Sequence, residues 1–400
     1  MSPPRRWPLH PQPGPLESLS SWLGRIASTY HLTVSDLLTR NLGQGDAVAP
    51  ELIDSDPPAW MLAALAERTG TGLAQLRAMT LAGWVPWLMD TLHTQPRDAQ
   101  ETFDTYIRQN SVLLAPGEAG HHRVTGRRRW AGPWWPARPV RRVCLACAED
   151  ADPRRALAWQ LPLTASCHEH GCRLEDSREV AAAAAHGEKP RPAPVPAALA
   201  TLDRYTYQAL ITGRVTLPGR AVHAGVWFRL LRSLLDEVSL AGSTVGTHGR
   251  AALERAWEAA GRPARGGLSI WRPYEQMDWP MQEAMLHAAA DALQLAADGQ
   301  ITARGVLGPA VQPAPHRHVY DGDQPSSPRP SAWDELMAAV SDAVALARTD
   351  SNAARQLLSL LTIGCRTLDR FEEERSYLSG IGIPAGFLPG ARELGRGDLA

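Results

Sequence analysis

The chain places four of its five cysteines in a single stretch of 29 residues, from Cys144 to Cys172. Cys144 and Cys147 are spaced C-x2-C, and after 19 intervening residues Cys167 and His170 are spaced C-x2-H. Zinc binds thiolates and imidazole in a tetrahedron, and two ligands three positions apart on a tight turn supply half of it. We therefore expect Cys144, Cys147, Cys167 and His170 to hold one Zn2+ ion.

Two other interpretations of this stretch stay open at the level of sequence. Cys172 is an additional thiol two positions after His170, so it can compete for the fourth ligand position. The cysteines can also be ordinary buried thiols beside a surface histidine. A disulfide framework is disfavoured, because a 400-residue chain with five cysteines and no apolar secretory core at its N-terminus is unlike a small disulfide-stapled scaffold.

A zinc site with four protein ligands has no coordination position left for water or substrate. Such sites are structural, and the binding energy of the metal becomes folding energy of a small domain. The sequence also lacks a G-x4-G-K-[ST] phosphate loop, and its sole lysine, Lys189, lies in a proline-rich stretch. No carboxylate cluster typical of a two-metal nuclease is evident. We therefore expect that the protein is not an enzyme, and a zinc-dependent hydrolase is a disfavoured alternative.

Length and composition predict a soluble globular protein of two or three domains, since 44% of the 400 residues are hydrophobic and 21% are charged. The net charge of -1 gives no overall sign of nucleic-acid binding. No run reaches the roughly 18 apolar residues of a membrane-spanning helix. We expect a cytoplasmic protein without membrane association, where reduced thiols favour metal binding over disulfides.

Helix signals occur in two pairs within the first 80 residues. Ser18 is expected to cap a helix that extends to residue 30, and Thr33 with Asp36 forms a capping box for a short second helix. A third helix, starting after two prolines, is expected to end at Gly70, and Thr71 is expected to cap a fourth.

The second of these pairs has the order of a helix-turn-helix: a helix, a glycine-containing turn and another helix. In that fold the second helix is free to enter a major groove of DNA. Arg77 is the long cation on the candidate recognition helix and is a predicted nucleic-acid contact. Short antiparallel helix pairs are also common packing units, so a purely structural role stays open.

Residues 121–142, HHRVTGRRRWAGPWWPARPVRR, contain seven arginines and three tryptophans without one acidic residue. Arginines interleaved with flat aromatic rings suit phosphate neutralisation and base stacking. The predicted nucleic-acid contacts here are Arg127, Arg128, Arg129, Arg141 and Arg142. The alternative is a solvated run of charge whose tryptophans pack on the zinc domain.

The fold expected from these patterns is mainly α, with four parts. They are an N-terminal helical region with the candidate helix-turn-helix (1–119), a small zinc-binding domain (120–180), an alanine- and proline-rich linker (181–198) and a helical C-terminal domain (199–400). Within the last part a helix is expected to end at Gly213. A clean helical period follows at Val222, Val226, Leu230, Leu234 and Val238.

Three segments of the chain together resemble the TniQ family, which includes TnsD-type proteins. They are WPLHPQPGPLESLSSWLGRIA, RVCLACAEDADPRRALAWQLPLTASCHEHGCRL and QALITGRV, so that the resemblance covers roughly residues 7 to 240. It implies zinc ligation by Cys144, Cys147, Cys167 and His170. One departure is that many relatives carry a proline after the first cysteine, where this chain reads CLAC.

The resemblance implies a target-selection adaptor of DNA transposition. Such an adaptor links target DNA, contacted directly or through a targeting complex, to an AAA+ ATPase that regulates transposition. The alternative function is a stand-alone zinc and helix-turn-helix transcription regulator, which needs no ATPase partner. A homodimer is compatible with either function, and the sequence predicts no role for the residues beyond about 240.

Overall fold

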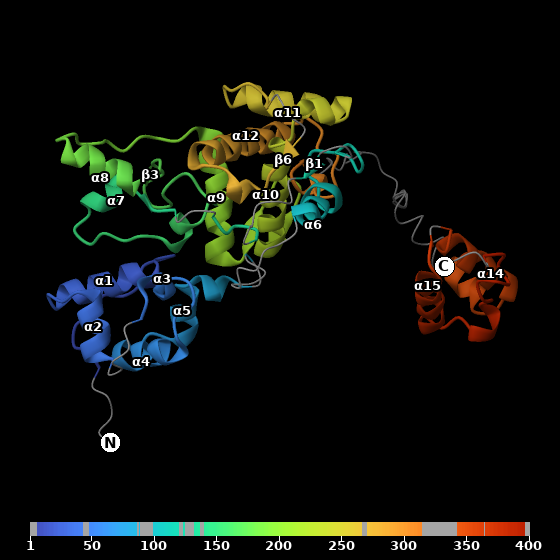
Figure 1. Ribbon diagram of the computed structural model, residues 1–400, viewed down its shortest axis with the longest axis horizontal. Helices are drawn as coiled ribbons and strands as arrows, with labels where there is room; N and C mark the ends of the chain where they lie inside the picture. The colour runs from blue at the N-terminus through green and yellow to red at the C-terminus, as the bar shows by residue number, and fades with distance from the viewer. Residues whose placement is uncertain are drawn as a thin grey trace, which may run out of the picture. The chain divides into compact units, whose positions relative to one another are not determined.

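The structure is a computed structural model that divides into two compact units, Met1–His316 and Arg317–Ala400. It is mainly helical, as predicted, and its short strands pair two by two among the described residues (Figure 1). The residues described are 6–42, 48–85, 88, 99–119, 123–124, 132–136, 140–265, 270–313, 342–363 and 365–396.

The first unit begins with short helices around a core of their own, which includes Trp22 and Leu23. Two of the predicted helix starts are confirmed, because Ser18 Oγ accepts the Ser21 N–H and Thr33 Oγ1 accepts the Asp36 N–H. These elements and those that follow are α1 (Leu19–Thr29), α2 (Val34–Asn41), α3 (Pro50–Ile53), α4 (Ala59–Thr69), α5 (Leu73–Ala78), the 3-10 helix η1 (Leu81–Trp84), α6 (Ala99–Phe103) and the π-helix η2 (Asp104–Gln109).

The predicted turn between α4 and α5 is present. Gly70 ends α4 with φ of 75°, a left-handed conformation that glycine adopts without strain. The prediction that Thr71 caps α5 is wrong: Gly72 holds the N-cap position, and the Thr71 hydroxyl instead accepts a hydrogen bond from that of Thr69. With only six residues, α5 exposes most of its surface, including Arg77.

The metal region, from β2 to the end of α8 (142–185), consists of short elements. It lies between the N-terminal helices and a larger helical body. Strand β2 pairs antiparallel with β3, and α7 and α8 follow these two strands directly. Strand β1 pairs parallel with the distant β6. The bounds are β1 (Arg123–Val124), β2 (Arg142–Val143), α7 (Leu145–Glu149), η3 (Leu157–Gln160), β3 (Glu175–Asp176), α8 (Ser177–Ala185) and β6 (Ile270–Trp271).

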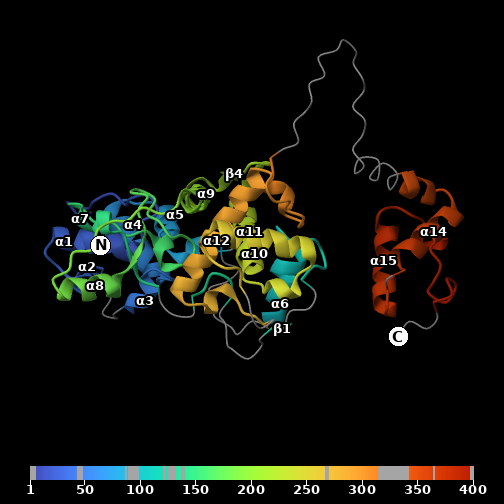
Figure 2. The same cartoon turned by 90° about the horizontal axis from the view of Figure 1, so that it is seen from above.

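The helical body packs α12 against α9, α10 and α11, as Figures 1 and 2 show. As predicted, Gly213 ends α9 with φ of 72°. Val222 departs from the predicted helical period, since it lies in β5 and the helix begins after His223, whereas Val226 lies in α10 but is exposed. The elements are α9 (Ala197–Thr212), β4 (Arg214–Thr216), β5 (Ala221–His223), α10 (Ala224–Val238), η4 (Gly242–Thr244), α11 (Thr247–Ala259), η5 (Tyr274–Gln276), α12 (Trp279–Ala297) and η6 (Gly308–Ala310).

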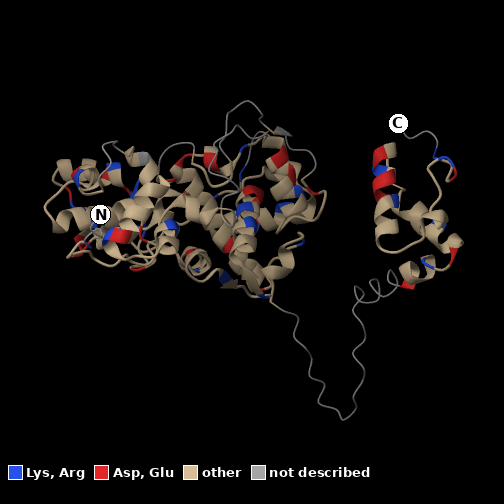
Figure 3. Cartoon of the chain, turned by 90° about the horizontal axis from the view of Figure 1, so that it is seen from below, with Lys and Arg blue, Asp and Glu red and all other residues tan. Residues whose placement is uncertain are grey.

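The second unit has a small core of its own, in which Leu358, Phe371 and Leu378 are fully buried. Cys365 is half-buried against this core. Acidic residues outnumber basic ones along α15, as Figure 3 shows, and its two arginines pair with Glu372, Glu373 and Glu374 of the same helix. The elements are α14 (Ser351–Leu361), α15 (Leu368–Gly380) and η7 (Ala385–Phe387).

The observed units differ from the boundaries expected from sequence. Residues expected to form one C-terminal domain are divided, because the boundary between units falls after His316. The first part of the expected linker is helical, since α8 extends to Ala185, and residues 186–196 then lead to α9. Among the residues that the structure describes, no helix combines the length and apolar character needed to cross a bilayer.

Candidate metal centre

The first half of the centre is a knuckle at the start of α7. Strand β2 leads into Cys144, which is the N-cap of α7, and the Cys144 Sγ accepts the Cys147 N–H at 3.3 Å. This hydrogen bond folds the chain so that Cys144 and Cys147 present their sulfur atoms on one side. Both side chains are buried.

The second half is a turn from Cys167 to Cys172. The Gly171 N–H donates to the Cys167 carbonyl at 2.9 Å, and the Cys167 N–H donates to the Cys172 carbonyl at the same distance. Gly171 has φ of 62°, so its lack of a side chain allows the chain to reverse here. The turn brings His170 back over the sulfur of Cys167.

The two halves meet as the spacing predicted. The donor atoms of Cys144, Cys147, Cys167 and His170 all lie within 4.8 Å of one another. His170 Nδ1 is 3.8 Å from Cys144 Sγ, 3.2 Å from Cys147 Sγ and 3.8 Å from Cys167 Sγ. Cys147 Sγ and Cys167 Sγ are 3.6 Å apart.

These separations fit the edges of a zinc tetrahedron. Usual zinc–sulfur and zinc–nitrogen bond lengths require sulfur–sulfur edges of about 3.8 Å and sulfur–nitrogen edges of about 3.6 Å. The observed distances lie within about 0.4 Å of these values. The residues present therefore fit a structural Zn2+ ion held by three thiolates and one imidazole.

A second group of donors overlaps with the first. Asp150 and Glu169 lie near Cys147 and His170, but both carboxylates are exposed. We favour the set with three cysteines, because structural zinc sites are built mainly from thiolate and imidazole and because its three sulfur atoms are buried.

The thiols of Cys144 and Cys147 resist ionisation in the absence of a cation. Hydrogen bonding with Cys167 and burial raise the pKa of Cys144, and burial raises the pKa of Cys147 to about 12. A divalent cation would supply the positive charge that such crowded sulfur atoms lack, and its binding would release their protons.

Helix α9 supports the turn that carries Cys167. Asp203 accepts hydrogen bonds from the Ala165 N–H and from both the backbone N–H and the hydroxyl of Ser166. The Tyr207 hydroxyl donates to the Ser166 carbonyl. Two buried side chains of one helix thus fix the residues directly before Cys167, a role that no sequence spacing indicated.

Arg142 was predicted as a nucleic-acid contact, and the structure contradicts this. Its side chain is buried, its guanidinium donates to the carbonyls of Trp159, Leu161 and Thr164, and it stacks on the Trp279 ring with its Cζ 4.3 Å from the ring centre. Because the side chain is buried and donates to three backbone carbonyls, it is not available for contact with nucleic acid. Arg142 joins the metal region to α12.

The other predicted nucleic-acid contacts divide into two groups. Arg77 and Arg141 are exposed, which a contact to DNA requires. Arg127, Arg128 and Arg129 lie outside the described residues. For all five, contact with nucleic acid stays a prediction.

The tryptophans predicted near the metal centre have different places. Trp159, which follows the basic stretch, is buried in the same cluster as the four cysteines of the metal region. Trp134 instead packs edge-on against Phe228 and Tyr274 of the helical body. Trp130 lies outside the described residues.

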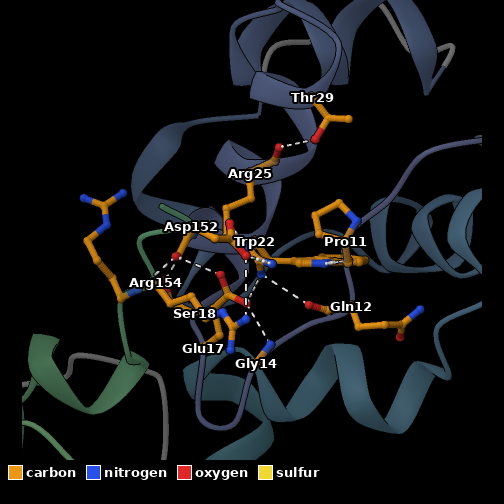
Figure 4. A network of polar contacts seen from close by, with 12 residues as sticks. Pro11, Gln12, Gly14, Glu17, Ser18, Trp22, Arg25, Thr29, Asp152 and Arg154 are labelled. Carbon is orange, nitrogen blue, oxygen red and sulfur yellow. Dashed lines mark hydrogen bonds and ion pairs between the residues drawn. The ribbon is translucent and has the colours of Figure 1, made fainter. Parts of the chain in front are cut away.

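A polar network joins the metal region to the N-terminal helices. The Arg25 guanidinium lies between the carboxylates of Glu17 and Asp152, and Figure 4 shows it reaching from α1 to the loop after α7. The Trp22 indole N–H in the same network donates to the Pro11 carbonyl at 2.7 Å. A second link is made where Gln160 donates to the Asp54 carboxylate.

Comparison with known proteins gives one match. The family model described as TniQ matches residues 8–174, a range that contains the N-terminal helices and the whole metal centre but ends before the QALITGRV segment. No curated protein and no solved structure matches the chain. Residues 8–174 of the chain are therefore similar to the TniQ family.

Proposed function

We propose that the protein is a zinc-containing target-selection adaptor of DNA transposition. In this role it links target DNA, or a complex that has located the target, to an AAA+ ATPase that regulates transposition. The observation that carries the proposal is the TniQ match over residues 8–174, within which all four candidate zinc ligands lie.

The form of the metal centre supports an adaptor rather than a catalyst. Four protein donors surround the position that the ion would take, and three of them are buried. Zn2+ would supply a fixed cross-link between the knuckle and the turn. The residues around it then hold the fold: Asp203 positions the turn before Cys167, and Arg142 attaches the region to α12.

The surfaces proposed to meet nucleic acid are the exposed α5 and the basic stretch before the knuckle. Arg77 and Arg141 supply exposed guanidinium groups, and Arg127, Arg128 and Arg129 are proposed to contact the phosphate backbone. Contacts to phosphate would position the protein on DNA without reading its sequence.

The first experiment measures binding to double-stranded DNA as a function of salt. Replacement of Arg127, Arg128 and Arg129 by alanine is expected to weaken binding about equally for all sequences. The slope of the logarithm of the binding constant against the logarithm of the salt concentration should also become shallower, by about 0.9 for each lost phosphate contact. The matched control replaces three exposed arginines elsewhere by alanine and should leave the slope unchanged: Arg178, Arg191 and Arg220.

The second experiment separates the adaptor from a stand-alone transcription regulator. The full chain is immobilised, and retention of an AAA+ ATPase that regulates transposition is measured with and without DNA. An adaptor retains the ATPase, whereas a regulator binds DNA and leaves the ATPase in solution. If the triple arginine variant binds DNA normally but loses the ATPase, the basic stretch is a protein-binding surface.

A further inference from the structure

One thiol of the metal region is not used by the proposed zinc set. Cys172 Sγ lies 3.2 Å from Cys144 Sγ, which is closer than the 3.6 Å between Cys147 Sγ and Cys167 Sγ. Two thiolates on the same zinc ion keep an edge of about 3.8 Å between them. A separation of 3.2 Å is therefore a contact between two thiols and not an edge of the metal tetrahedron.

The position of Cys172 is fixed by its backbone as well as by its sulfur. The Cys172 carbonyl accepts the Cys167 N–H, and Cys172 forms an isolated β-bridge with Pro194. On the other side, the Cys172 sulfur contacts Cys144, which is the N-cap of α7. The sulfur is thus held against the start of α7, beside Cys144.

We propose that Cys144 and Cys172 form an oxidation site, at which hydrogen peroxide joins the two sulfur atoms in a disulfide. Cys172 is 7% exposed and Cys144 is fully buried, so the oxidant meets Cys172 first. The Cys172 sulfur attacks one peroxide oxygen, which gives a sulfenic acid and one water. Cys144 Sγ then attacks that sulfur and displaces the second water.

In this sequence two thiols lose two electrons and two protons, and peroxide is reduced to two waters. The sulfur atoms must approach by about 1 Å to reach the disulfide bond length of about 2.0 Å. That displacement is small enough for side-chain rotation, because both residues already face each other.

Disulfide formation and zinc binding exclude each other because both need Cys144. Oxidation leaves Cys147, Cys167 and His170 as the remaining donors of the set, which no longer closes the tetrahedron. The folded state then loses the stabilisation that bound metal provides. Because the two thiols are buried, they react with peroxide more slowly than a free thiol does. The disulfide would therefore form only under sustained exposure to the oxidant.

The test uses the zinc-loaded full chain exposed to hydrogen peroxide. Released Zn2+ is followed with a chromogenic chelator, and disulfides are assigned by fragmentation mass spectrometry without reduction. The expected result is about one equivalent of Zn2+ released for each Cys144–Cys172 disulfide formed. Dithiothreitol followed by Zn2+ should restore the original metal content.

Cys172→Ser is the diagnostic variant, and Cys172→Ala guards against an effect of the new hydroxyl. Both should bind zinc normally before oxidation and release far less of it in the same interval. Cys365→Ser, which alters a cysteine of the second unit, should behave like the wild type. A linkage between Cys147 and Cys167, whose sulfur atoms are 3.6 Å apart, with unchanged release from Cys172→Ser would overturn the proposal. Loss of zinc from Cys172→Ser without oxidant would overturn it too, because Cys172 would then be a ligand.

Discussion

Arg25 and Asp152 are 127 positions apart in the chain, yet the Arg25 guanidinium donates two hydrogen bonds to the Asp152 carboxylate. The Nε–Oδ1 and Nη2–Oδ2 distances are both 2.5 Å. Such a paired arrangement is the strongest form of arginine–carboxylate contact. It attaches α1 to the loop that follows the metal-binding knuckle, so the N-terminal helices and the metal region are expected to unfold together.

This contact makes a prediction about acid stability. The hydrogen bond from Arg25 lowers the pKa of Asp152 below its ordinary value of 3.8. The stability that it contributes is therefore present above about pH 4 and is lost as the pH falls through the lowered pKa. Asp152→Asn should melt below the wild type at pH 7, and the two should converge in acid. Thermal unfolding followed by circular dichroism checks this, with the exposed Glu188→Gln as a control that should match the wild type throughout.

Metal content provides the second prediction. The purified protein should contain about one equivalent of zinc. Cys167→Ser should lose it, because the tetrahedron loses a donor, and Cys172→Ser should keep it. Elemental analysis of the two variants decides, and equal loss from both would show that Cys172 is a ligand.

The third prediction concerns Asp203, which positions the turn before Cys167. Burial raises its pKa from 3.8 to about 7, so the folded state binds a proton that the unfolded state has already released. Its contribution to stability is complete below about pH 4 and is lost as the pH rises through 7. Asp203→Asn keeps a neutral group of the same shape, and its stability should therefore fall less than that of the wild type over this range. Urea unfolding at pH 5 and pH 8 measures the difference, and parallel curves would contradict the assignment.

The fourth prediction separates two adjacent arginines. Arg142→Ala leaves three buried carbonyls without their donor, at a cost of about 1–3 kcal/mol for each unsatisfied group. Arg141→Ala alters an exposed side chain and should change stability by no more than about 0.5 kcal/mol. Urea unfolding measures both. An equal effect of the two substitutions would show that the buried hydrogen bonds of Arg142 contribute little.

The local features of this chain could be predicted from its sequence, because their causes are local. The spacing of Cys144, Cys147, Cys167 and His170 determines two turns of a few residues, and each turn brings two donors together whatever the rest of the chain does. The caps at Ser18 and Thr33 depend on a side chain and an N–H group three positions away. Neither kind of contact requires knowledge of the tertiary structure.

Features that depend on distant segments could not be predicted. The sequence offers no sign that distinguishes Arg141 from its neighbour Arg142. The pairing of β2 with β3 and the position of Trp279 determine that Arg141 is exposed and Arg142 is buried. The support that Asp203 gives to the metal turn needs α9 to return to that turn. Thr71 failed as a cap because the turn after Gly70 makes Gly72 the N-cap of α5.

The contacts of Asp203 and Tyr207 also bear on how this chain can be cut. The family match ends at residue 174, but the backbone before Cys167 is held by side chains that lie about 30 to 40 positions later. A fragment that ends with the match would expose the face of the metal region that α9 covers and would leave the amide groups of Ala165 and Ser166 without their acceptor. Residues 8–174 are thus expected to need α9 in order to fold.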